Sequence, residues 1–179
     1  ERGFRGHIGA MLRGRLTTGG LKLVGGGLVA MYLAFDLDDL LASSVDVLVI
    51  ALAANTANLL DRAPGRATKA AMLALALVLG VNGLDDQLSA LTLVVGATFG
   101  LLVVELEERV MLGDTGVNPL GAVFGWSVVQ MSGTWVTVGV LVLLVALNLA
   151  SERVSFSTVI ARNGFLRWYD ELGRPTGPA

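Results

Sequence analysis

The sequence contains no cysteine and only one histidine, His7, among its 179 residues. The first absence excludes disulfide bonds and thiolate metal sites, and the second excludes zinc sites built from several histidines. Charged residues make up 16% of the chain, against about a quarter in typical soluble domains, and the net charge is only −2. The chain therefore lacks the basic surface that a nucleic-acid-binding protein needs. His7 is interpreted as a surface or interfacial residue.

Apolar residues are abundant where charges are missing. They form 54% of the sequence and give it a mean hydropathy of +0.69. The 23 glycines outnumber the aromatic residues, which is typical of helices that pack closely in a lipid bilayer. We therefore expect a membrane protein made of helices.

Six apolar segments approach the roughly 20 residues that a helix needs to cross a bilayer. They are predicted at Thr18–Phe35, Val45–Leu60, Ala70–Gly83, Leu88–Val104, Val117–Met131 and Thr134–Ala150. The fold class expected is thus all-α: a polytopic transmembrane helix bundle of about six spans within residues 1–151. As an alternative, the last two segments could form a re-entrant hairpin.

Along the chain, connections that contain lysine or arginine alternate with connections that contain neither. Lysine and arginine occur before the first segment, in the loops 61–69 and 105–116, and after the last segment, with Lys22 in the first turns of the first span. The other three loops contain none, and two of them carry the acidic pairs Asp38-Asp39 and Asp85-Asp86. Positively charged loops mark the cytoplasmic side, so both termini are expected there. The acidic pairs are interpreted as solvated charges on the opposite side.

The last part of the chain, residues 152–179, is predicted to be a cytoplasmic amphipathic tail. Within it, Ser155–Leu172 spaces apolar residues among basic ones, as in a helix that lies on a membrane surface. Trp168 and Tyr169 would then lie at the depth of the lipid headgroups.

A first polar stretch closes the second predicted span. Asn55, Asn58 and Asp61 recur every three residues, so they share one side of a helix. The cations that follow, beside these amides and the carboxylate, suit a ligand that carries phosphate at the membrane surface; they are Arg62, Arg66 and Lys69. The alternative is that the two asparagines pack helices together and that the cations only follow the charge rule.

A second polar stretch, Gly113-Asp114-Thr115-Gly116, precedes the fifth predicted span on the same side. Glycines allow a close approach of backbone to ligand, and Mg²⁺ commonly binds one or two carboxylates together with phosphate oxygens. Asp114 is therefore a candidate metal ligand. The alternative is a turn in which Asp114 or Thr115 caps a helix.

Both stretches resemble a known family. The residues in question are Asn55-x-x-Asn58-Leu-x-Asp61, then Met111-Leu-Gly-Asp114-Thr-Gly116, then Leu120-Gly121. In order and separation they are similar to motifs of the polyprenyl-phosphate N-acetylhexosamine-1-phosphate transferases (glycosyltransferase family 4), which include the phospho-MurNAc-pentapeptide translocase. The tail from Glu152 to Arg174 also resembles tails of a divergent branch of this family.

The resemblance implies transfer of a sugar-1-phosphate from a nucleotide sugar to a polyprenyl phosphate in bacterial envelope glycan synthesis. By position, Asp114 would be a catalytic residue and the ligand of Mg²⁺, or of Mn²⁺ in its place. Asp61 would be catalytic as well, and Asn55, Asn58, Arg62, Arg66 and Lys69 would bind substrate. The implied partners are polyprenyl phosphate, a nucleotide sugar, the membrane and, as one option, a second copy of the chain. The active face would be the cytoplasmic face of the bacterial inner membrane.

The sequence also departs from the family pattern. Pro64 occupies the place of a second aspartate, Val117 that of a serine, and Val104 that of an asparagine. The family's acidic dyad and further spans would precede Glu1, so we expect an N-terminal part to be missing. The alternative function is a non-catalytic relative that binds lipid-phosphate carriers or serves as a membrane partner subunit. A transporter is disfavoured because the predicted spans contain few ionisable residues.

Overall fold

The computed structural model describes residues 9–175 except positions 11, 16 and 84. All regular elements in that part of the chain are helices. They are α2 (Thr18–Ala34), α3 (Leu40–Leu60), α4 (Arg66–Asn82), the short 3-10 helix η1 (Asp86–Leu88), α5 (Ser89–Leu106), α6 (Gly113–Met131), α7 (Thr134–Ser151), α8 (Phe156–Arg162) and α9 (Gly164–Glu171). The prediction of an all-α chain is confirmed for these residues, whereas His7 lies outside them.

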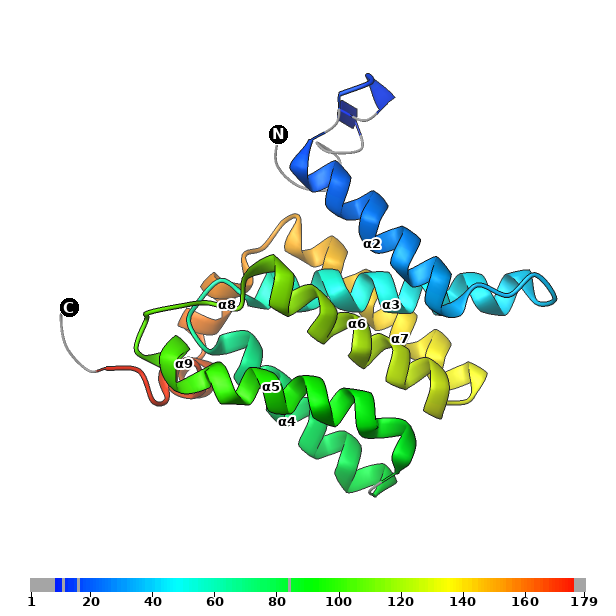
Figure 1. Ribbon diagram of the computed structural model, residues 1–179. Coiled ribbons are helices and arrows are strands. Elements are labelled where there is room, and N and C mark those ends of the chain that lie inside the picture. Colours follow the sequence, from blue (N-terminus) through cyan, green and yellow to red (C-terminus); the bar gives the residue numbers. More distant parts are fainter. Residues whose placement is uncertain (1–8, 11, 16, 84, 176–179) are drawn as a thin grey trace.

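Helix α3 is the centre of the bundle. It packs against α6, α7 and α2, and the hairpin of α4 and α5 joins through α5 to α6. Consecutive helices from α3 to α7 run in opposite directions, as Figure 1 shows. Each of the six predicted spans thus corresponds to one helix of the bundle.

The contact between α3 and α6 depends on two glycines one helical turn apart. A Cβ atom at Gly121 would lie only 2.5 Å from the backbone oxygen of Ala53 and 2.7 Å from Cβ of Ala57. At Gly125 it would lie 2.8 Å from Cα of Ile50. Glycine therefore allows the two backbones to approach more closely than any other residue would.

The outside of the bundle is apolar. Large side chains such as Leu93, Val103 and Val142 are 74%, 65% and 64% exposed. A surface of this kind is stable in lipid and unusual in water. Among the described residues, three helices are long and apolar enough to cross a membrane: Leu40–Leu60, Asp86–Leu106 and Thr134–Ser151.

The two ends of the bundle differ in charge. The turn after α3, the turn after α5 and the tail lie at one end, at the left in Figure 1, and carry the basic residues. The connections with Asp38-Asp39 and Asp85-Asp86 lie at the other end, where Asp39 and Asp85 accept hydrogen bonds from the backbone of the helices that follow them. The alternation read from the sequence is thus a separation in space.

The polar loops are shorter than predicted. Gly65 and Gly113 adopt positive φ angles of 69° and 61°, and helices α4 and α6 start directly at or after them. Arg66, Lys69 and Asp114 consequently lie in first helical turns. Neither Asp114 nor Thr115 caps α6, because the cap position is Leu112.

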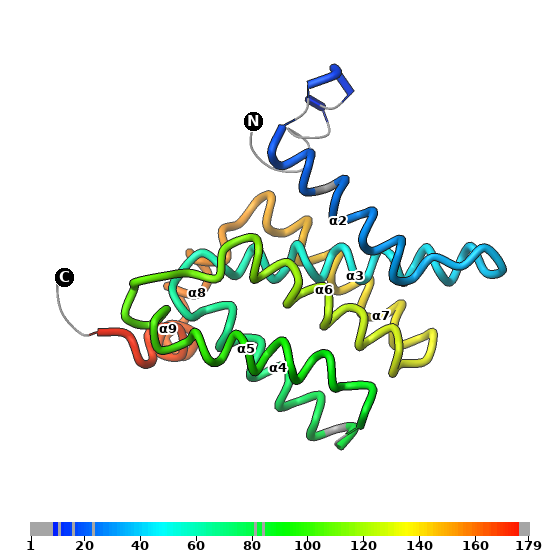
Figure 2. Tube along the Cα trace, viewed as in Figure 1, coloured from blue at the N-terminus to red at the C-terminus, as the bar shows by residue number. Residues whose placement is uncertain are grey.

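The tail is also different from the expected single helix. It breaks at Asn163 into α8 and α9, because the Asn163 side chain accepts a hydrogen bond from the backbone N–H of Leu166 and so starts a new helix. Figure 2 shows α9 nearly end-on, while the bundle helices run across the view. The tail therefore crosses the end of the bundle.

Candidate functional site

Asp61 and Asp114 meet at the basic end of the bundle. Asp61 follows the last residue of α3 and faces the start of α6. Burial raises the pKa of the Asp61 carboxyl, the backbone N–H of Gly113 lowers it, and the nearby carboxylates of Glu105 and Asp114 raise it further, leaving it above its ordinary value. The Oδ1 atom of Asp61 is buried and has no hydrogen-bond partner among the described residues. This corner of the structure, formed by Asp61, Glu105 and Asp114, is called the acidic corner below.

Glu105 supports the acidic corner from inside. Its side chain is fully buried near the end of α5. It accepts a hydrogen bond of 2.7 Å from the Thr68 hydroxyl and one of 3.0 Å from the backbone N–H of Leu112. It thus ties α4 to the loop that leads into α6. Sequence reasoning gave Glu105 no role; the signal was a carboxylate at the very end of an apolar span.

Asp114 is half exposed and forms an ion pair with Lys22 of α2. Lys22 is 92 positions away in the sequence, so only the packing of α2 across the bundle brings the two together. The sequence alone placed Lys22 in the first turns of the first span, without assigning it a partner. A ligand of Asp114 would have to share this carboxylate with Lys22 or displace it.

The two asparagines of the first motif differ in environment. Asn55 donates a hydrogen bond to Asn148 of α7, and Asn148 in turn donates to Thr56 at 2.9 Å. Asn55 thus joins α3 to α7, which was the packing alternative considered from the sequence. Asn58 is half-buried, and its side chain has no hydrogen-bond partner within the described part of the chain.

Arg62 stands apart from the other predicted cations. It lines an open pocket of about 190 Å³ together with Arg153, Val154 and Phe156, where the end of α3 meets the start of the tail. Both guanidinium groups are exposed, and neither has an ion-pair partner among the residues that the structure describes. The pocket combines two cations with an apolar wall, although Glu152 also lines it.

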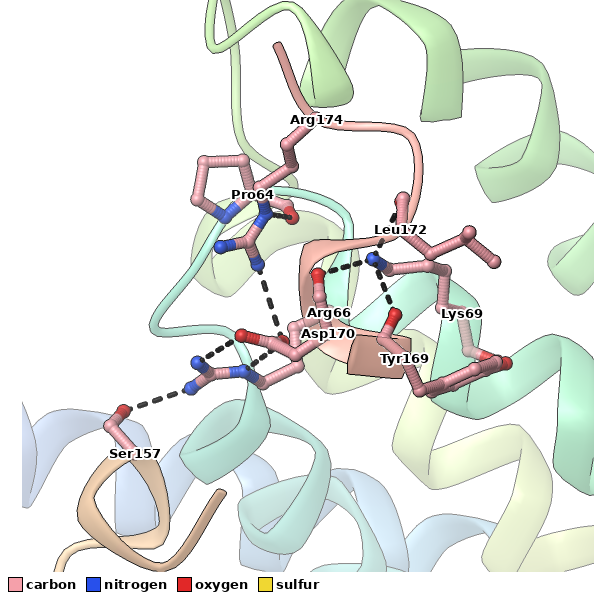
Figure 3. A network of polar contacts seen from close by, with 8 residues as sticks. All are labelled: Pro64, Arg66, Lys69, Ser157, Tyr169, Asp170, Leu172 and Arg174. Carbon is pink, nitrogen blue, oxygen red and sulfur yellow. Dashed lines mark hydrogen bonds and ion pairs between the residues drawn. The ribbon is translucent and has the colours of Figure 1, made fainter. Parts of the chain in front are cut away.

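Arg66 and Lys69 are bound by the tail, as Figure 3 shows. Arg66 forms two parallel bonds to Asp170, of 2.6 Å from Nε to Oδ1 and 2.8 Å from Nη2 to Oδ2, and donates to Ser157 at 2.8 Å. Lys69 donates to the backbone oxygens of Tyr169, Asp170 and Leu172, and the Tyr169 hydroxyl donates to the backbone oxygen of Lys69. The tail thus closes over the start of α4.

Asp170 is the central acceptor of this contact. Burial alone would raise the pKa of its carboxyl, but the hydrogen bond from Arg66 and the charges of Arg174, Arg66 and Lys69 lower it below its ordinary value. Arg174 also approaches Asp170 at 3.2 Å and donates to the backbone oxygen of Pro64. Sequence reasoning missed Asp170, because an acidic residue in a basic tail gives no sign of its distant partner.

The acidic corner has some of the features that a magnesium ion requires. Asp61 offers a buried oxygen without a partner, and Asp114 lies close enough to raise its pKa. No group of three or more potential metal ligands of the His, Cys, Asp or Glu type occurs among the described residues. The corner therefore fits an ion that is held by one or two carboxylates and completed by phosphate oxygens, and does not fit an ion enclosed by protein ligands.

Comparison of the chain with protein-family models, with curated proteins and with solved structures gives no significant match.

Proposed function

We propose that this chain is a six-span membrane protein that transfers a sugar-1-phosphate from a nucleotide sugar to a polyprenyl phosphate, with Mg²⁺ at the acidic corner. The observation that carries this proposal is that Asp114 lies close enough to Asp61 to raise its pKa, at the end of the bundle that also carries the exposed Arg62. Phosphoryl transfer needs carboxylates for a metal and cations for phosphate. The resemblance of the two motifs supplies the reaction.

The proposed reaction is a substitution at phosphorus. A phosphate oxygen of the lipid forms a bond to the β-phosphorus of the nucleotide sugar, and the bond from that phosphorus to the bridging oxygen breaks, so that nucleoside monophosphate leaves. Asp114 and Asp61 would hold the ion, and Mg²⁺ would neutralise charge on the transferring group. Arg62 and Arg153, with Phe156 beside them, would receive the phosphate of the lipid.

The activity test uses the purified chain in vesicles with undecaprenyl phosphate, a UDP-sugar and Mg²⁺, and measures release of UMP. We expect release that depends on Mg²⁺ and is abolished by Asp114→Ala. Asp86→Ala, at the opposite end of the bundle, is the control and should leave the rate unchanged. Full activity of folded Asp114→Ala protein would refute the assignment of this residue.

The proposed topology puts both termini and the acidic corner on the cytoplasmic side of a bacterial inner membrane. Because the chain has no cysteine, single cysteines report sidedness cleanly. In intact cells, Asp86→Cys should react with a membrane-impermeant maleimide and Arg62→Cys should react only after the membrane is opened. Both positions are exposed, so burial cannot imitate either result. The reverse pattern would overturn the topology.

A second candidate is a non-catalytic relative that binds lipid-phosphate carriers or serves as a membrane partner subunit. It is favoured by the internal partners of four predicted site residues, namely Asn55, Arg66, Lys69 and Asp114. Arg62 and Arg153 would then be the phosphate site by themselves. Binding of polyprenyl phosphate that Arg62→Gln weakens, without any release of UMP by the unsubstituted chain, would favour this candidate.

A further inference from the structure

Helix α9 has two sides that serve different contacts. Tyr169 and Asp170 face α4 and are held there by Lys69 and Arg66. Phe165 and Trp168 on a neighbouring side of the same helix, and Leu172 directly after its last residue, are 70%, 57% and 47% exposed. The ring centroids of Phe165 and Trp168 lie 5.9 Å apart, and these three residues are called the aromatic face below.

We propose that the aromatic face of α9 inserts into the lipid headgroup region of the membrane that surrounds the bundle, and that the contact with Arg66 and Lys69 fixes the bundle to that anchor. Three observations lead to a lipid surface rather than to a protein partner: the depth at which α9 is held, its direction, and the chemistry of its exposed residues.

The first observation is depth. The contacts of α9 are with Arg66 and Lys69, in the first turn of α4, only a few residues beyond the end of the candidate span Leu40–Leu60. A bilayer that covers this span therefore ends within about one helical turn of α9, since a turn rises about 5.4 Å.

The second observation is direction. Helix α9 is seen end-on in Figure 2, whereas the bundle helices run across the view. A helix that crosses the end of a membrane bundle in this way lies roughly in the plane of the bilayer surface. Its eight residues are also far too few to enter the hydrocarbon as a span. The geometry is that of an interfacial helix.

The third observation is composition. Tryptophan is enriched where membrane and water meet, and phenylalanine supplies apolar surface to the acyl chains. The exposed Arg162 and Arg167 lie within a few residues of Phe165 and Trp168 in the chain and can approach anionic headgroups, against one exposed acidic residue of α9, Glu171. Asp170 is already paired with Arg66 inside the protein and does not oppose this attraction.

The proposal can be tested with Trp168 as its own reporter. The full chain with Trp126→Phe and Trp135→Phe keeps Trp168 as its sole tryptophan and is reconstituted in vesicles of neutral and anionic lipid. Lipids brominated near the glycerol end should remove most of the Trp168 emission, lipids brominated deep in the chain should remove less, and aqueous acrylamide should remove little.

Phe165→Ser should decrease quenching by the brominated lipids, because Phe165 belongs to the aromatic face and makes no contact that holds α9 on α4. Glu171→Ser, at another exposed position of the same helix, is the control and should leave quenching in the neutral vesicles unchanged. Efficient quenching by acrylamide without lipid quenching would show a tail in water and overturn the proposal. Protection from both quenchers would show a protein or a second copy over the face and would overturn it equally. Neither readout requires enzymatic activity.

Discussion

Asp170→Asn is the most informative single change in this chain. The substitution keeps the size of the side chain and one acceptor oxygen, but it removes the charge that pairs with Arg66 and places amide hydrogens opposite the guanidinium. The side chains of Arg66 and Asp170 are each only 10% exposed, so water cannot replace the lost partner. We expect the tail to open, because no other carboxylate among the described residues pairs with the buried Arg66.

The free-energy cost of Asp170→Asn follows from the burial of the ion pair between Arg66 and Asp170. Removing one partner of a buried ion pair costs about 3–5 kcal/mol. Arg66 retains its hydrogen bond to Ser157, and Lys69 still binds the carbonyl oxygens at the end of α9, so the lower end of that range applies. A cost of about 3 kcal/mol corresponds to a roughly hundredfold larger population of the open tail.

Limited trypsin digestion measures that population directly. Trypsin can cleave after Arg162 and Arg167 when α8 and α9 leave the bundle. The cleavage rate follows the fraction of open tail while opening and closing are fast. Asp170→Asn creates and removes no trypsin site. The control is Glu171→Gln, which makes the same change of charge at an exposed neighbouring position. We expect a rate increase of roughly a hundredfold for the first variant and almost none for the second.

The pH dependence of tail opening provides an independent check that the charge of Asp170 stabilises the closed tail. Since the folded structure lowers the pKa of Asp170, its ion pair stabilises the closed tail fully above the ordinary value of 3.8 and loses that effect as the pH falls through the lowered pKa. Cleavage of the unsubstituted chain, divided by the cleavage rate of an unfolded substrate at the same pH because trypsin itself loses activity, should thus be constant from neutral pH down to about pH 5. Equal cleavage rates for the Asp170 and Glu171 variants would refute the reasoning, because they would show that the pair does not hold the tail.

Three further changes test other parts of the structure. Gly121→Leu should destabilise the bundle by about 3 kcal/mol or more in detergent unfolding, because its Cβ alone would overlap α3. Gly139→Leu, on the open side of α7, is the control and should be neutral. Equal effects of the two substitutions would refute the close packing of α3 and α6. Glu105→Ala should cost about 1–3 kcal/mol in the same assay, since it leaves the buried Thr68 hydroxyl and the partly buried Leu112 N–H unpaired. The exposed Glu107→Ala should cost little. Because the pKa of Asp61 is raised, ionisation of this carboxyl destabilises the fold as the pH rises. Asp61→Asn should therefore increase stability at neutral pH and abolish any rise in melting temperature caused by Mg²⁺. A Mg²⁺ response equal to that of the unsubstituted chain would place the ion elsewhere.

The periodic features of this chain could be predicted from its sequence. Apolar runs separated by short polar turns define helices whatever they pack against, and all six predicted segments became helices of the bundle. The alternation of basic and acidic loops likewise determined which ends lie together, because consecutive helices joined by short loops must run in opposite directions. The same order brought Asp61 and Asp114 to one corner, as the two motifs had indicated.

The partners of the polar residues required the tertiary structure. Asp170 lies 104 positions from Arg66 and Lys22 lies 92 positions from Asp114, and no local pattern records a contact across such distances. The sequence could only count Arg66 and Lys69 as cations at a membrane surface; folding turned them into the anchor of the tail and left Arg62 exposed. Charge and hydropathy are properties of residues in order along the chain, whereas a pairing is a property of helices packed in space. The first could therefore be read from the sequence, and the second was decided only by the way α3, α4 and the tail come together.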